Sequence, residues 1–371
     1  MKETNRRNGA IEFWRFIFAA LIVMRHTMFL PSYLTGQYHW VNGQSIGVEF
    51  FFIVSGFLMA RSALNYEGNT GIATGKFILR KWLAILPAYL FAHLASALLY
   101  LIFQPDEFSG VFSDSLFQVL MLQITGLVDI NSWLVESSWY LSAMLLAMLV
   151  LFPMLHAKRQ LFLNVIVPCV TIYFMQEKCL KYGYLDTFDY SNDTFRMFPY
   201  FTRAMAMICL GCIAHNICSH ITKENHNIHP TRLLKTLLTI AEFGCYLTVV
   251  VASMFIERSR WDFFAVILLA AAVTISFSGL SWSPELFSSL IFSWLGKLSL
   301  SVYLNHFMWI RVLRETNMDL TLVQELVISI SLITTSSLFC MFLTETLKLL
   351  WKNNKPKIKS LFIKEKQIET S

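Results

Sequence analysis

The stretch IEFWRFIFAALIVMRH, residues 11–26, is an apolar run that carries a glutamate, two arginines and a histidine. Continued to residue 30, the run reaches the roughly 20 residues that a helix needs to cross about 30 Å of hydrocarbon. An ionisable side chain inside such a span is costly, so it usually faces a protein interior or a water-filled cavity. The stretch therefore predicts a first membrane helix, and its ionisable residues Arg15, Arg25 and His26 are candidates for a functional role.

The composition of the whole chain extends this prediction. Of the 371 residues, 56% are hydrophobic and only 15% are charged, which leaves too little polar surface for a soluble globule. The aromatic residues fit membrane interfaces better than base stacking, so no nucleic-acid partner is expected. The cysteines are odd in number, seven, and lie mostly within apolar runs, so no disulfide framework is implied. We predict an all-α, polytopic integral membrane protein.

Apolar runs of spanning length recur along the chain and predict about ten transmembrane helices. The expected spans are 11–30, 46–63, 82–103, 138–156, 160–176, 198–218, 234–256, 262–280, 291–312 and 323–347. The stretch 116–130 is shorter and is interrupted by Gln118, Gln123 and Gly126, which favours an interfacial or re-entrant helix. If it crossed the membrane instead, every later loop would change sides.

The distribution of Lys and Arg sets the orientation, because cytoplasmic loops near membrane helices carry an excess of both. Residues 31–45 and 104–115 contain neither, whereas residues 61–81 and the stretch 352–366 are basic. Both termini are therefore predicted to be cytoplasmic. We expect a transmembrane domain over residues 1–350 and a basic cytoplasmic tail over residues 351–371, in the lipid bilayer of a plasma (inner) membrane.

The first helix presents Arg15 and His26 on one face. They are 11 positions apart, and at about 100° and 1.5 Å per residue they differ by about 20° in direction and about 16 Å in height. This distance is too long for both to contact one substrate atom, so a regular helix gives them distinct roles. Glu49, near the level of His26 in the next span, could orient the imidazole. Snorkelling of both side chains to the two membrane surfaces is the alternative.

Two further groups carry polar side chains within apolar runs. Tyr303 and His306 are three positions apart and so share a helix face, which fits either a buried, satisfied histidine or a cavity wall. Cys209, Cys212 and His215 also follow a spacing of three. This spacing drifts about 60° per step around a helix, so the ligands would not converge on one ion. We predict no metal site.

Five blocks in order resemble the acyltransferase family 3 membrane proteins. They are IEFWRFIFAALIVMRH with its R-x10-H spacing, GVEFFFIVSGF, FILRKWLAILPAY, SSWYLSAMLLAMLVLFP and LGKLSLSVYLNHFMW. The blocks spread over most of the chain, although residues 157–285 match only as hydrophobic spans. The resemblance implies a transferase that moves an acyl group, most often acetyl, from cytoplasmic acetyl-CoA or another acyl-CoA to a hydroxyl. The implied acceptor is a surface or exported carbohydrate or a lipid-linked glycan.

Carried onto this sequence, the essential pair of the family is Arg15 and His26. A histidine can serve as general base or as a transient acyl carrier, and an arginine can bind CoA phosphates or a developing oxyanion. The third block adds Arg80 and Lys81 as expected donor-binding residues. Further expected cavity-lining residues are Arg25, Trp139, Tyr303 and His306, and Glu49 completes the predicted catalytic set.

Two positions depart from the family pattern and keep alternatives open. Ala84 stands where many members carry a further basic residue, and the glutamate that often follows the tryptophan of the fourth block is missing after Trp139. An inactive acyltransferase-like sensor is therefore one alternative. A transporter or flippase for a glycan or small solute is the other, because buried charges also line translocation paths.

Overall fold

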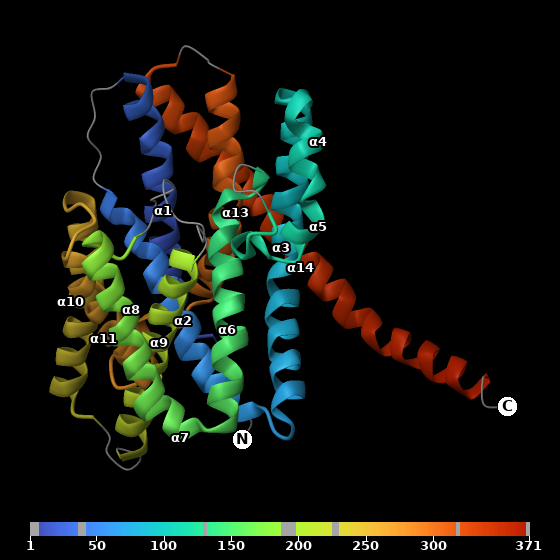
Figure 1. Cartoon of the computed structure of the whole chain (residues 1–371). Helices are drawn as coiled ribbons and strands as arrows, with labels where there is room; N and C mark the ends of the chain where they lie inside the picture. The colour runs from blue at the N-terminus through green and yellow to red at the C-terminus, as the bar shows by residue number, and fades with distance from the viewer. Residues whose placement is uncertain are drawn as a thin grey trace.

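The computed structural model of the chain describes residues 7–35, 42–128, 132–186, 198–224, 230–316 and 320–368. Over these ranges all regular secondary structure is helical and no strand occurs. The long helices stand side by side in one bundle (Figure 1). The predicted all-α class is confirmed.

Each predicted span corresponds to one long helix of the described chain. These helices are α1 (Gly9–Thr35), α2 (Gly47–Ser62), α3 (Thr70–Phe103), α6 (Trp139–Ala157), α8 (Val167–Tyr182), α9 (Phe198–Glu224), α10 (Arg232–Phe255), α11 (Trp261–Ser278), α13 (Leu290–Glu315) and α14 (Leu322–Ile368). The shorter helices are α4 (Pro105–Ser113), α5 (Ser115–Val119), α7 (Arg159–Leu161) and α12 (Ser283–Leu286), and the 3-10 turns include η1 (Asn42–Ile46) and η5 (Glu136–Ser138).

Eight helical segments among the described residues are long and apolar enough to cross a membrane, which supports a multi-pass membrane protein. The helices α1 and α13 are not among these eight. They pack against each other, and they carry Arg15, Arg25, His26 and His306, four residues singled out in the sequence.

The short apolar stretch 116–130 does not form a spanning helix in its described part. Helix α5 ends at Val119, and only a 3-10 turn, Gln123–Thr125, follows before residue 128. Both interrupting glutamines are fully buried. The Nε2 atom of Gln118 donates to the Ser132 carbonyl and that of Gln123 to the Tyr89 hydroxyl. The stretch therefore gives no reason to invert the predicted topology.

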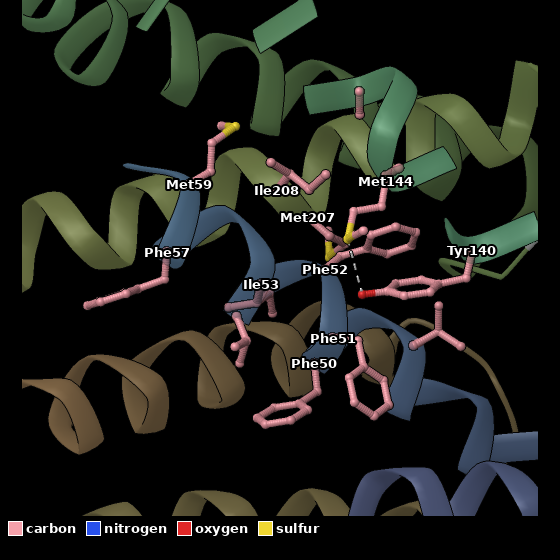
Figure 2. Packing of buried hydrophobic residues seen from close by; sticks show 14 of the residues in the cluster. Phe50, Phe51, Phe52, Ile53, Phe57, Met59, Tyr140, Met144, Met207 and Ile208 are labelled. Atoms are coloured by element: carbon pink, nitrogen blue, oxygen red, sulfur yellow. Dashed lines mark hydrogen bonds between the residues drawn. The ribbon is translucent and has the colours of Figure 1, made fainter. Parts of the chain in front are cut away.

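Helix α2 is enclosed by its neighbours, and its aromatic run is buried (Figure 2). It crosses α9 at Gly56 and Gly211. A Cβ atom on Gly56 would lie 2.0 Å from the Ile208 carbonyl oxygen, and one on Gly211 would lie 2.0 Å from that of Ile53. Only glycine permits this backbone contact, so the close crossing of the two helices depends on both positions.

Helix α14 runs without a break from Leu322 to Ile368. Its last part projects away from the bundle (Figure 1). The helix continues through residue 350, so the boundary between membrane domain and tail stays a prediction.

Candidate active site

The side chain of His26 on α1 faces His306 on α13. The Nδ1 atom of His26 lies 3.0 Å from Nε2 of His306, and the two rings are stacked with centroids 5.0 Å apart. The other nitrogen of His306, Nδ1, lies 2.7 Å from the backbone carbonyl oxygen of Tyr303. His306 itself is fully buried. A chain of three groups therefore holds the His26 imidazole in place.

This chain determines which nitrogen of His26 is basic. A carbonyl oxygen only accepts, so Nδ1 of His306 donates to Tyr303. In a neutral imidazole the other nitrogen is then an acceptor. His306 Nε2 therefore accepts a hydrogen bond from the N–H group at Nδ1 of His26. The Nε2 atom of His26 keeps its lone pair, and no hydrogen bond to it is formed by the described residues. The lone pair on Nε2 is thus the one on His26 that can take up a proton.

His26 lines a cavity of about 490 Å³, which we call the histidine cavity. Its walls combine aromatic rings with charged groups. The aromatic lining residues are Tyr100, Trp133, Trp139, Tyr200, Tyr303 and Phe307. The charged lining residues are Arg25, Arg203, Arg311, Arg314, Glu136, Asp186 and Glu315. Aromatic faces with a few convergent polar groups are typical of a small-molecule site.

Buried ion pairs support one side of the histidine cavity, and Glu49 belongs to them. The Oε1 atom of Glu49 accepts from Arg203 Nε at 2.9 Å and from Arg258 Nη2 at 2.8 Å. Arg203 also binds Asp186 at 2.6 Å, and Arg258 binds Asp262 at 2.7 Å. All five side chains are at most 4% exposed. We call them the ion-pair cluster.

The pKa shifts of Asp186 and Arg258, the two members of the ion-pair cluster that lie in loops, show how the charges of the cluster act on one another. Burial alone would raise the pKa of Asp186, but the Arg203 and Arg258 guanidinium groups outweigh it and hold this pKa below its ordinary value. For Arg258, burial acts to lower the pKa, and the carboxylates of Glu49 and Asp262 raise it above its ordinary value. Each charge of the cluster is thus stabilised by its partners.

The predicted contact between Glu49 and His26 is replaced by a different arrangement. The carboxylate of Glu49 is engaged by two guanidinium groups, and His306 occupies the orienting position on His26. The reason is charge: the buried arginines from α9 and from the loop before α11 need buried anions, and Glu49 is the carboxylate that pairs with both of them. Glu49 is therefore placed as a support of the cavity wall.

A second cavity, of about 290 Å³, lies toward the opposite ends of α1 and α13. We call it the basic cavity, because its lining has five cations and one anion. They are Arg7, Arg15, Lys81, Lys297, Lys348 and Glu345. Lys297 pairs with Glu345 at 2.5 Å. Arg15 lies 3.4 Å from Glu12, as expected from their spacing, and keeps a quarter of its side chain exposed.

The structure distributes the predicted residues over both cavities. Arg15 lines the basic cavity and His26 the histidine cavity, in keeping with the distinct roles predicted from their separation. Lys81 lines the basic cavity, but its neighbour Arg80 is exposed and lies outside both.

Trp139 and Arg25 line the histidine cavity, as predicted. The ring of Trp139 lies under the guanidinium of Arg203, with 5.3 Å between the guanidinium carbon and the ring centroid. The guanidinium of Arg25 lies 3.4 Å from the carboxylate of Asp186.

Sequence reasoning gave no role to several residues of the site. Asp186 and Arg258 lie in loops, where the sequence does not distinguish a buried charge from an exposed one. Lys348 directly follows the predicted span 323–347, where a lysine reads as a topological signal. Arg203 and Lys297 were available clues, because each is a charge within a predicted span. Among the described residues, no three His, Cys, Asp or Glu side chains are placed to hold a metal ion.

The described structure thus places an oriented imidazole and two cavities along one helix pair. The comparison with protein families gives the class: a family model described as an acyltransferase domain matches residues 8–345. The match covers nearly the whole chain, so the chain belongs to acyltransferase family 3, and the resemblance of the five sequence blocks is confirmed. The comparisons with curated proteins and with solved structures gave no match.

Proposed function

We propose that this membrane acyltransferase is an O-acetyltransferase that uses acetyl-CoA to acylate a hydroxyl of a surface or exported carbohydrate. The observation that carries the proposal is the His26 imidazole, whose Nδ1 is held by His306 and whose side chain lines a cavity of about 490 Å³. A positioned base of this kind is what the attack of a weakly acidic sugar hydroxyl requires.

In the direct reaction, Nε2 of His26 takes the proton of the acceptor hydroxyl as its oxygen attacks the thioester carbonyl carbon. The carbon–oxygen ester bond forms and the carbon–sulfur bond breaks. Coenzyme A leaves as the thiolate and takes up the proton from His26. In the two-step alternative, the same nitrogen first accepts the acyl group and then passes it to the hydroxyl. Both routes need the orientation that His306 imposes.

The basic cavity is the proposed donor site. Coenzyme A carries phosphate groups, and Arg15 and Lys81 with the other cations of this cavity supply charges that suit them. Ala84, the departure from the family pattern, lines the same cavity. Lys297 and Lys348 add positive charge there, which supports donor binding without a basic residue at position 84.

The histidine cavity is the proposed acceptor site. Its aromatic walls can stack on sugar rings, and its arginines and carboxylates can bind hydroxyl groups. The acceptor class that fits is a carbohydrate, free or lipid-linked. The location proposed with it is a plasma or inner membrane, with about ten spans that include α1 and α13 and with both termini in the cytoplasm. The basic cavity would then open toward the cytoplasmic pool of acyl-CoA.

The test is transfer of radioactive acetyl from acetyl-CoA into glycan by membranes that hold the wild type or His26→Ala at equal protein level. We expect label with the wild type and a loss of about 10² to 10⁴-fold in the variant. The matched control is His156→Ala, which removes a histidine of α6 that bonds Thr70 and lines neither cavity. It should label normally.

Other results would select the alternatives. Labelling by His26→Ala at the wild-type rate would remove His26 from the chemistry. A wild type that moves glycan across the membrane unmodified and without acyl-CoA would be a transporter. Binding of acyl-CoA without turnover would indicate the sensor.

A further inference from the structure

One side chain lines both cavities. Tyr303 on α13 lines both the histidine cavity and the basic cavity, and it is only 5% exposed. Its ring lies one helical turn from His306, with centroids 5.9 Å apart. Among the described residues, Tyr303 is the one lining residue that the two cavities share, so a direct route from the basic cavity to His26 runs past the ring of Tyr303.

Tyr303 does not form this wall alone. Its ring centroid lies 5.8 Å from that of Tyr140 and 6.0 Å from that of Phe51, and the centroids of Tyr140 and Phe51 are also 6.0 Å apart. These distances are those of rings in direct contact. Phe51 and Tyr140 line the basic cavity, and Figure 2 shows the two rings close together. We call the three rings the aromatic triangle.

Hydrogen bonds fix the triangle at its edges. The Tyr303 hydroxyl donates to the Ser137 carbonyl oxygen at 3.0 Å, and the Tyr140 hydroxyl lies 3.4 Å from the Ser55 hydroxyl. The carbonyl of Tyr303 accepts from His306. The residue that closes the passage also anchors the partner of the base, so the position of the ring and that of the imidazole are linked.

We propose that the aromatic triangle is the acyl-length filter of the enzyme. This inference rests on the proposed transfer from acyl-CoA to the histidine cavity. The thioester arrives through the basic cavity, and its acyl group must enter between three rings that are already in contact. An acetyl group needs the smallest displacement. Each further methylene needs more space in a closely packed interior, where added volume forces the neighbours out of place.

The test compares initial rates of membranes supplied with acetyl-, propionyl-, butyryl- or hexanoyl-CoA, each labelled in its acyl group. The readout is the ratio of the butyryl to the acetyl rate. This ratio does not depend on the amount of folded protein, so a variant that folds poorly still reports on selectivity. The decisive variant is Phe51→Ala, which widens the triangle without touching His306 or its carbonyl partner.

The matched control is Phe50→Ala, which removes the neighbouring ring of the same helix. Phe50 is fully buried, stacks on Phe18 at 4.4 Å and lines neither cavity. Phe50→Ala removes a buried ring of the same type that touches Phe51, with ring centroids 5.7 Å apart, but that does not itself border the passage. Tyr303→Phe, which keeps the ring and loses only the bond to Ser137, is the second control.

We expect the wild type to prefer acetyl-CoA and Phe51→Ala to raise the butyryl-to-acetyl ratio at least about tenfold, the discrimination that a well-packed pocket obtains from added methylenes. Phe50→Ala and Tyr303→Phe should keep the wild-type ratio. An unchanged ratio in Phe51→Ala would overturn the filter, and so would a wild type that uses hexanoyl-CoA as readily as acetyl-CoA. Both results leave the proposed function standing. A wild type that accepts no thioester overturns the proposed function and the filter with it.

Discussion

At the scale of single residues, the contact between His26 and His306 predicts that the rate of acyl transfer depends on His306. With His306→Leu, His26 loses the acceptor that fixes its tautomer, and Nε2 is no longer held as the base. We expect kcat for acyl transfer to fall by about 10² to 10⁴-fold. The KM for acetyl-CoA should change little, because the cations proposed to bind it line the other cavity. Initial rates over a range of acetyl-CoA concentrations measure both constants.

Two variants separate positioning from simple loss of stability. In His306→Gln the amide can still accept from His26, so part of the rate should return. His93→Leu removes another buried imidazole, which bonds Ser115 and lies outside both cavities, and it should leave kcat per folded protein unchanged. If His306→Leu and His93→Leu lower the rate equally, His306 has no positioning role.

At the scale of helices, the crossing of α2 and α9 determines where the ion-pair cluster forms. Gly211→Ala places a methyl group against the carbonyl of Ile53, which cannot move aside as a side chain can. The helices must separate, at a cost of about 1 to 3 kcal/mol, and Glu49 on α2 moves away from Arg203 on α9. We expect a lower unfolding temperature in detergent and a weaker transfer activity per folded protein.

The control is Gly244→Ala on α10, where an added Cβ meets nothing within 4 Å. An exposed helical glycine replaced by alanine should stabilise by about 0.5 to 1 kcal/mol. Thermal unfolding followed by intrinsic fluorescence compares the two variants. Equal stability of Gly211→Ala and Gly244→Ala would contradict the close crossing.

The positions of the helices along the chain could be predicted from the sequence, but which residues of different helices come into contact could not. Apolar length indicates each span without reference to the rest of the chain. The 11-residue spacing of Arg15 and His26 likewise predicted that the two side chains lie too far apart to meet, and they line different cavities. The partner of Glu49 is different, because Arg203 lies 154 positions away. His306 lies 280 positions from His26. Which of several buried charges meet depends on helix packing, and no local pattern encodes it.

At the scale of the whole molecule, the two cavities lie toward opposite ends of α1 and α13, and the loops near them differ in charge. The end that holds Lys81 and Lys297 is rich in basic residues. The segment 104–115 at the other end of α3 has no lysine or arginine. Figure 1 places α4, which belongs to this segment, far from the start of α3. The positive-inside rule therefore predicts that the basic end faces the cytoplasm.

This orientation predicts the labelling of single cysteines in a chain whose seven native cysteines are replaced by alanine. Ser109→Cys in α4 should react with a membrane-impermeant maleimide on intact cells. Asn69→Cys, at the start of α3, should react only after permeabilisation. A donor from the cytoplasm could then reach the basic cavity, while the histidine cavity faces the exported acceptor. Labelling of Asn69→Cys on intact cells, with Ser109→Cys protected, would reverse the two sides and leave the basic cavity without access to cytoplasmic acyl-CoA.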